Sequence, residues 1–155
     1  MRVAMSTNLD TSAQRAWTEV QTLRLLIHVA WPLLSFEPIN PRTFPAMWQE
    51  SRYLVRMRAF GVISIGQQWI VITKPMLGRD CYQLRDNGHG NLFSRWDHLI
   101  TIEPLGPGRC RYTDEVEVEA GLLTPIMRLF VYVFYAHRQR RWRRLVRNNF
   151  SYRSR

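Results

Sequence analysis

The strongest pattern in the chain is its last apolar stretch and the arginine-rich stretch that follows it. Apolar residues crowd the segment from Ile126 to Tyr135, and arginines dominate from Arg138 onward. Because no glycine or proline follows Pro125, residues 125–148 predict one helix of about 36 Å, at 1.5 Å per residue. Its first half is apolar around most of its circumference, which predicts that a broad partner buries it.

The start of the chain predicts a strand followed by two short helices. Residues 2–9 alternate weakly between apolar and polar side chains, as expected for a strand. Apolar residues then recur at helical spacing over 13–20 and again over 23–30, and Pro32 ends the second helix.

Between these helices and the last one, about six segments show the alternation typical of strands. Short turn sequences join them, including Asp86-Asn87-Gly88 and the stretch from Leu105 to Gly108, which favours an antiparallel meander. The segments lie at 34–36, 53–58, 69–73, 81–85, 93–103 and 109–120. The predicted fold is therefore α+β, with the final helix covering one face of an antiparallel sheet.

Alternation also assigns several polar or aromatic side chains to the covered face of this sheet. These are Tyr53, Met57, Tyr82, Trp96, His98, Tyr112 and Asp114. A buried carboxylate is costly unless it is paired, and buried tyrosine and tryptophan need hydrogen-bond partners. Asp114 should lie across the predicted turn from His98 or from Ile100, so we expect a hydrogen bond between His98 and Asp114. This pair either fixes strand register, orients a ligand in an apolar pocket, or takes part in catalysis.

Length and composition limit the alternatives. The chain has 155 residues, of which 46% are apolar and 12% aromatic, and this predicts one folded domain over 1–150 and a short basic tail over 151–155. Its apolar runs are too short to cross a membrane and no signal peptide opens it, so we expect a soluble cytoplasmic protein. Cys81 and Cys110 match no metal-ligand spacing and are expected to be free thiols; no metal or cofactor is expected. Both a monomer and a homodimer remain open.

The net charge of +10 belongs mainly to one end of the last helix. No acidic residue follows Glu119, and removing the eight arginines from Arg138 onward leaves 14 basic against 12 acidic residues. The arginines of this helix end either pair in part with Glu115, Glu117 and Glu119, or stay solvated, or dock on an anionic membrane surface. The candidate contacts with such a surface are Arg138, Arg141 and Arg144. Nucleic acid is disfavoured, because the rest of the chain shows no basic face with interleaved aromatic residues.

Three short stretches, together with the order of elements, resemble a known superfamily. Arg95-Trp96-Asp97-His98 is like a Trp-x-His strand, Tyr112-Thr113-Asp114-Glu115-Val116 like a Thr-Asp-x-Val strand, and Phe134-Tyr135-Ala136-His137-Arg138 like a Phe-x-x-Arg-His stretch. These resemble the SRPBCC superfamily, the helix-grip proteins that include START domains, polyketide cyclases and plant pathogenesis-related allergens. The resemblance covers nearly the whole chain. It implies a curved, seven-stranded antiparallel sheet wrapped around the C-terminal helix, with a hydrophobic cavity between them.

The function expected from this combination is binding or transport of a hydrophobic or aromatic small molecule, lipid-like or polyketide-like, in that cavity. The candidate ligand-binding residues are Tyr53, Met57, Trp69, Tyr82, Trp96, His98, Tyr112, Asp114, Phe130 and Phe134. The loop 38–45 and the turns 76–80 and 86–91 would form its rim. The alternative is a cyclase-like or dehydratase-like enzyme with His98 as base and Asp114 as the carboxylate that orients it. The sequence contains no glycine-rich phosphate loop and no serine nucleophile elbow.

Overall fold

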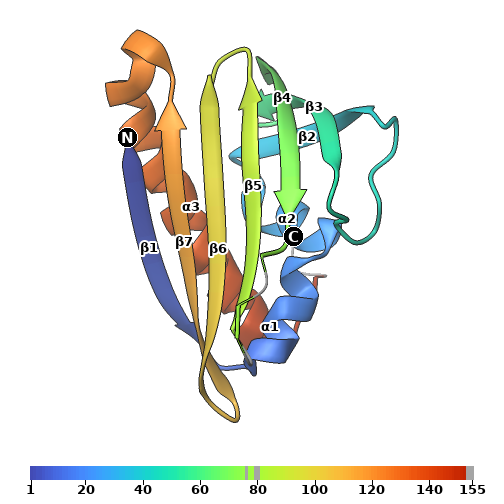
Figure 1. The fold of residues 1–155 in the computed structure, drawn as a ribbon, viewed down its shortest axis with the longest axis vertical. Coiled ribbons are helices and arrows are strands. Elements are labelled where there is room, and N and C mark those ends of the chain that lie inside the picture. Colours follow the sequence, from blue (N-terminus) through green and yellow to red (C-terminus); the bar gives the residue numbers. More distant parts are fainter. Residues whose placement is uncertain (76, 79–80, 153–155) are drawn as a thin grey trace.

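A curved antiparallel sheet and the long C-terminal helix laid across one of its faces make up most of the structure (Figure 1). The computed structural model describes residues 1–75, 77–78 and 81–152. Its seven strands are ordered β1-β7-β6-β5-β4-β3-β2, and every neighbouring pair is antiparallel. The elements are β1 (Arg2–Leu9), α1 (Ala13–Val20), α2 (Leu23–Ala30), β2 (Leu34–Asn40), β3 (Arg52–Ala59), β4 (Ile63–Thr73), β5 (Tyr82–Gly90), β6 (Arg95–Gly106), β7 (Arg109–Glu119), the 3-10 helix η1 (Gly121–Leu123) and α3 (Thr124–Arg147). The predicted helix-grip architecture is confirmed.

The helix α3 begins and ends close to its predicted limits. The Thr124 hydroxyl donates to the Gly121 carbonyl at 2.7 Å and accepts the Ala120 amide at 3.1 Å, which ties the helix start to the end of β7. Pro125 fits the first turn, where its missing amide proton has no intrahelical partner to lose. The buried side of α3 carries Trp142 and Leu145 among its largest side chains.

The expectation that a broad partner buries the first half of α3 on all sides is wrong. Leu129 is 68% exposed and Leu122, just before the helix, is 100% exposed. Ile126, Tyr132 and Val133 are exposed as well. Only one side of this half faces the sheet, because α3 crosses behind the β1 edge (Figure 1). An apolar stripe is therefore left uncovered by the described residues.

The Asn87-Gly88 pair lies inside β5 and not in a turn, so the prediction there is wrong. A Cβ atom on Gly88 would lie 2.4 Å from the Trp69 carbonyl oxygen, and one on Gly90 would lie 2.2 Å from the Gln67 carbonyl oxygen. The glycines are thus required by the close approach of β4. β5 thus continues beyond the predicted segment 81–85, through Asp86, to Gly90.

Two other strands extend beyond their predicted limits. β4 begins at Ile63, six residues earlier than predicted, and β2 continues through Pro38 into the predicted loop 38–45. Proline is tolerated there because β2 is an edge strand, paired only with β3. The turn predicted at 76–80 lies partly outside the described residues.

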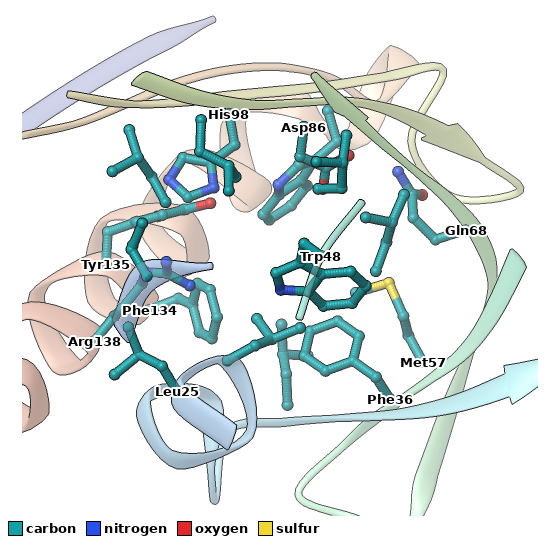
Figure 2. A pocket seen from close by; sticks show the side chains of 18 residues that line it. Leu25, Phe36, Trp48, Met57, Gln68, Asp86, His98, Phe134, Tyr135 and Arg138 are labelled. Atoms are coloured by element: carbon teal, nitrogen blue, oxygen red, sulfur yellow. The ribbon is translucent and has the colours of Figure 1, made fainter. Parts of the chain in front are cut away.

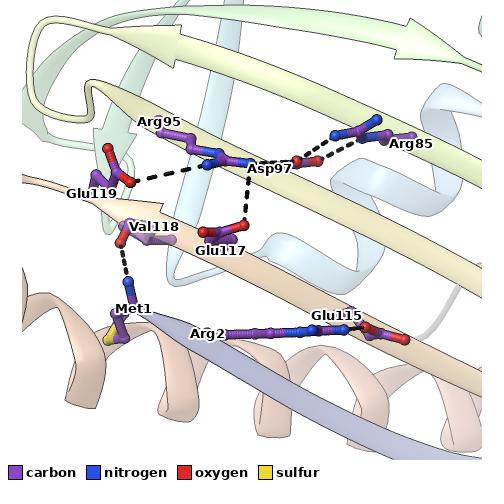
Figure 3. A network of polar contacts seen from close by, with 9 residues as sticks. All are labelled: Met1, Arg2, Arg85, Arg95, Asp97, Glu115, Glu117, Val118 and Glu119. Carbon is purple, nitrogen blue, oxygen red and sulfur yellow. Dashed lines mark hydrogen bonds and ion pairs between the residues drawn. The ribbon is translucent and has the colours of Figure 1, made fainter.

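The outer face of the sheet carries a ladder of ion pairs (Figure 3). Arg95 lies 3.1 Å from Glu117 and 4.0 Å from Glu119, and Arg2 pairs with Glu115. The alternative in which these three glutamates pair with arginines of the helix end is wrong, since they point away from α3 and are paired with Arg2 and Arg95.

The remaining expectations concern the termini, the cysteines and the membrane. Cys81 and Cys110 are both free thiols. No helix of the described chain is both long and apolar enough to span a bilayer. Of the predicted basic tail, 153–155 lie outside the described residues, while the Tyr152 hydroxyl donates to Glu19 at 2.6 Å.

Candidate functional site

A cavity lies between the inner face of the sheet and the helices α2 and α3 (Figure 2). Its walls are mainly apolar, and the polar side chains among them are Gln68, Asp86, His98 and Arg138, with the tyrosine Tyr135. The complete lining consists of Val20, Leu25, Leu26, Leu34, Phe36, Trp48, Met57, Gln68, Ile70, Ile72, Leu84, Asp86, Trp96, His98, Ile100, Phe134, Tyr135 and Arg138.

The volume of this cavity limits what it can hold. About 70 Å³ is open to the centres of water molecules. At about 10–15 Å³ for each water, this corresponds to roughly five waters. Drug-sized pockets usually offer about 300–1,000 Å³. In its present shape the cavity therefore fits a small molecule and not a long acyl chain.

The polar side chains come together because β5 and β6 are paired in one register. Asp86 stands opposite His98, and the alternation of both strands points these two side chains inward. Gln68 reaches the same region from β4, and Arg138 from α3. His98, Asp86 and Gln68 thus lie on the sheet side of an otherwise apolar cavity, whereas Arg138 lies on its helix side (Figure 2).

The carboxylate of Asp114, beside this region, is the centre of a buried hydrogen-bond network. Its Oδ1 lies 2.8 Å from His98 Nε2 and accepts the Tyr112 hydroxyl at 2.8 Å, and its Oδ2 accepts Gln139 Nε2 at 3.1 Å. The guanidinium Nε of Arg138 lies 3.6 Å away as the balancing charge. The predicted hydrogen bond between His98 and Asp114 is present.

These contacts determine the protonation of the pair. Burial by itself raises the pKa of Asp114, but the hydrogen bond from His98 and the charge of Arg138 outweigh it and leave that pKa below its ordinary value. Burial lowers the pKa of His98, although Asp114 opposes this. An ionised Asp114 beside a neutral His98 places the imidazole proton on Nε2, and Nδ1 keeps its lone pair.

Asp86 is a site residue that the sequence interpretation missed. Burial raises the pKa of its carboxyl to about 7, and the Val71 amide, which donates to Oδ1 at 2.8 Å, only partly opposes this. The Asn87-Gly88 turn signal concealed it. The signal that could have found it is the alternation of Tyr82 and Leu84, which continues to Asp86.

Gln68 is a second missed residue. It is only 5% exposed, it lines the cavity, and its Nε2 donor finds no acceptor within the described part of the chain. Buried polar groups are nearly always hydrogen-bonded, so this donor in the cavity wall is available to an oxygen atom inside the cavity.

Four of the ten predicted ligand-binding residues line the cavity: Met57, Trp96, His98 and Phe134. Four others lie on the inner side of the sheet but contact protein groups and not the cavity. Tyr53 packs edge-on against Trp48, and Tyr82 stacks on Trp17 with centroids 5.3 Å apart. Tyr112 and Asp114 belong to the hydrogen-bond network described above.

The other two predicted ligand-binding residues lie away from the cavity wall. Phe130 is half-buried and stacks on Phe134, with ring centroids 6.0 Å apart. Trp69 lies on the outer side of β4 under the Arg52 guanidinium, 4.6 Å from its ring centroid. The placement of Trp69 in the cavity is corrected, because Gln68 and Ile70 occupy the inward positions of that strand.

Trp48 and Tyr135 are further lining residues that the sequence interpretation missed. Trp48 lies between the predicted loop 38–45 and β3 and has no periodic neighbours, so no local pattern marked it. The Trp48 amide donates to the Gln21 carbonyl at 2.7 Å, which fixes this loop against the start of α2. Tyr135 was visible only as part of the apolar run in α3.

The predicted set of anionic-surface residues is divided by the structure. Arg138 is 6% exposed and its NH2 group donates to the Tyr112 hydroxyl at 3.2 Å, so it cannot face a membrane. Asp114 supplies the partner that makes its burial possible. The other two predicted residues remain accessible at the helix end, since Arg144 is exposed and Arg141 is half-buried.

Residues 7–146 match a family model described as "Domain of unknown function (DUF8410)". No curated protein matches the sequence. A conserved protein from Geobacillus kaustophilus shares the fold at 13% identity and a TM-score of 0.64, with 96% of each chain covered. A START superfamily protein from Mycobacterium smegmatis does so at 14% identity and 0.63, covering 95% of this chain and 97% of that one.

A third similar structure is norcoclaurine synthase from Thalictrum flavum in complex with dopamine and hydroxybenzaldehyde. It is 13% identical, with a TM-score of 0.61 and coverage of 97% of this chain and 88% of that chain. Identities this low show the fold alone. They show that this chain shares the fold of a START superfamily protein.

Proposed function

The chain belongs to the DUF8410 family, and we propose that it binds a small, largely apolar or aromatic molecule that carries an oxygen acceptor, in the cavity between the sheet and α3. The observation that carries this proposal is the unpaired Gln68 Nε2 donor in an otherwise apolar wall. A carbonyl, ether or hydroxyl oxygen of the ligand would accept a hydrogen bond from this donor. This bond would remove the free-energy cost of burying the donor without a partner.

The chemistry of the walls supports a ring-sized guest. Trp48, Phe36 and Phe134 present aromatic side chains to the cavity, and such side chains favour stacked or edge-on contacts with other rings. A lipid-like or polyketide-like guest of several rings needs a larger space than about 70 Å³. Met57, whose unbranched side chain adapts its shape, is the wall residue best suited to enlarge it.

Native mass spectrometry of protein purified from its own cells tests the proposal most directly. We expect a retained small molecule that is lost on denaturation. Titration with benzaldehyde, followed by intrinsic tryptophan fluorescence, gives an independent measurement, because Trp48 and Trp96, two of the six tryptophans, lie in the cavity wall.

A pair of variants on β4 locates the binding. Ile70→Phe fills the cavity from a buried wall position, whereas Ile63→Phe adds the same group at a residue that is 58% exposed on the same strand. We expect Ile70→Phe to abolish the fluorescence response and Ile63→Phe to retain it. Equal responses from both variants would place binding outside the cavity and refute the proposal.

A second candidate function is proton transfer in the same cavity, as in a cyclase-like or dehydratase-like enzyme. The 2.8 Å contact between His98 and Asp114 favours it, because it orients a neutral imidazole whose Nδ1 can accept a proton. The test incubates the protein with a ketone in D₂O and measures the exchange of the ketone's α-carbon proton for deuterium. Exchange that His98→Gln abolishes, while binding persists, supports a base; undiminished exchange rules His98 out.

A further inference from the structure

A second concave site lies between α2 and the C-terminal half of α3. His28 lines it from α2, and His137, Arg140, Arg141 and Arg144 line it from α3. Leu145 and Asn148 complete the lining. Its volume is about 260 Å³, and it shares no lining residue with the apolar cavity. Every ionisable group in this basic groove is an arginine or a histidine.

The end of α2 holds two of these side chains in place. The Nε of Arg141 donates to the His28 carbonyl at 2.7 Å, and His137 Nε2 lies 2.9 Å from the Trp31 carbonyl. The last carbonyls of a helix have no partner within it, so these contacts satisfy α2. These two contacts use only Arg141 Nε and His137 Nε2, so they do not engage the two terminal nitrogens of Arg141.

The positive charge of the groove is not balanced by any carboxylate in the described chain. Among the described residues, no ion pair includes Arg140, Arg141 or Arg144. Glu19, the buried carboxylate on α1, is already paired with Arg15 at 2.9 Å and Arg24 at 2.7 Å.

The positive groups of the groove repel one another. Arg140 and Arg144 stand four residues apart, a spacing at which like charges on a helix repel each other. Burial and the charge of Arg144 lower the pKa of Arg141, and burial and the charge of Arg141 lower the pKa of His28. A bound anion would reverse this repulsion.

We propose that the basic groove binds a phosphoryl group. Guanidinium forks donate pairs of parallel hydrogen bonds to phosphate oxygens, and a dianion matches three closely spaced arginines better than a single carboxylate does. Arg141, held by the end of α2, provides a pre-oriented donor, and Arg140 and Arg144 close around the anion from adjoining turns. The phosphoryl group belongs either to a soluble phosphate compound or to a phosphatidic acid headgroup.

The test for a soluble source is calorimetric titration of the full chain with inorganic phosphate at constant ionic strength, set with chloride. We expect saturable binding that Arg144→Gln weakens by about tenfold or more, as for loss of a hydrogen bond to a charged group. The matched control is Arg147→Gln, which removes the same charge from an exposed residue of the last turn that does not line the groove. It should bind like the unaltered protein.

The test for a lipid source is sedimentation with vesicles of phosphatidylcholine alone or with phosphatidic acid added. Binding only to vesicles that contain phosphatidic acid, lost in Arg144→Gln and kept in Arg147→Gln, supports the groove with a lipid headgroup as its ligand. The proposal is overturned if neither probe binds, or if both variants weaken binding equally, since the effect is then one of net charge alone.

Discussion

His98 Nε2 lies 2.8 Å from Asp114 Oδ1, although the two residues are not opposite each other in the sheet. In the register of β6 and β7, Ile100 faces Asp114 and His98 faces Val116, so the contact is diagonal. The same carboxylate also accepts Gln139 from α3. One buried charge therefore connects two strands to the helix that covers them.

We expect Asp114→Asn to lower the free energy of unfolding by about 3–5 kcal/mol, because it leaves the buried Arg138 without its balancing charge. Urea denaturation measures this. The control is Glu117→Gln on the outer face of the same strand, where the ion pair with Arg95 is exposed and its loss should cost less than about 1 kcal/mol. Similar losses in the two variants would contradict a special role for the inner carboxylate.

Asp86 should make the protein less stable as pH rises from about 4 to 7. Its pKa is raised from 3.8 to about 7, so in this range the folded state keeps a proton that the unfolded chain releases. The stabilisation is complete below pH 3.8 and is lost as pH passes through this window. Asp86→Asn should remove the loss, which is on the order of 4 kcal/mol at most.

Urea midpoints measured at several pH values test this prediction for Asp86. Asp97→Asn serves as the control of opposite sign, because the hydrogen bond from Arg85 lowers the pKa of Asp97. Removing Asp97 should cost stability at neutral pH and cost less as the pH falls through its folded-state pKa. If the stability of Asp86→Asn follows pH in the same way as the unaltered protein, the carboxyl is not held in its neutral form.

Gln68→Leu should separate the stability of the empty protein from ligand affinity. Removing an unpaired buried amide should raise the free energy of unfolding by about 1–3 kcal/mol. Benzaldehyde should bind about tenfold more weakly, while toluene, which has no oxygen, should bind unchanged. Gln67→Leu, at the adjacent exposed position, is the matched control and should change neither affinity. Equal weakening for both compounds would indicate a change of shape and not a lost hydrogen bond.

Gly88→Ala should destabilise the protein by about 1–3 kcal/mol or more, because the new Cβ would lie 2.4 Å from the Trp69 carbonyl oxygen. Gly108→Ala, where a Cβ meets nothing within 4 Å, should be close to neutral. Thermal unfolding of both variants provides the comparison. A neutral Gly88→Ala would mean that β4 and β5 do not approach this closely.

The local patterns of the sequence determined the architecture. The alternation on β6 and β7 assigned Trp96, His98 and Asp114 to the covered face, and the uninterrupted run after Pro125 predicted α3. These predictions hold because the two periodicities, 2 for a strand and 3.6 for a helix, depend only on neighbouring residues. The contact between His98 and Asp114 followed from the short turn that joins their strands.

The tertiary structure alone decided which covered side chains reach the cavity and how each charge is used. Arg138 is buried because Asp114, 24 positions away in the chain, lies beside it, whereas the sequence showed only one more arginine among many. Asp86 and Gly88 belong to a strand because β5 pairs with β4, which at Gly88 approaches too closely for a side chain. The curvature of the sheet, and the single side of α3 that it covers, arise from contacts between distant segments, which no local periodicity encodes.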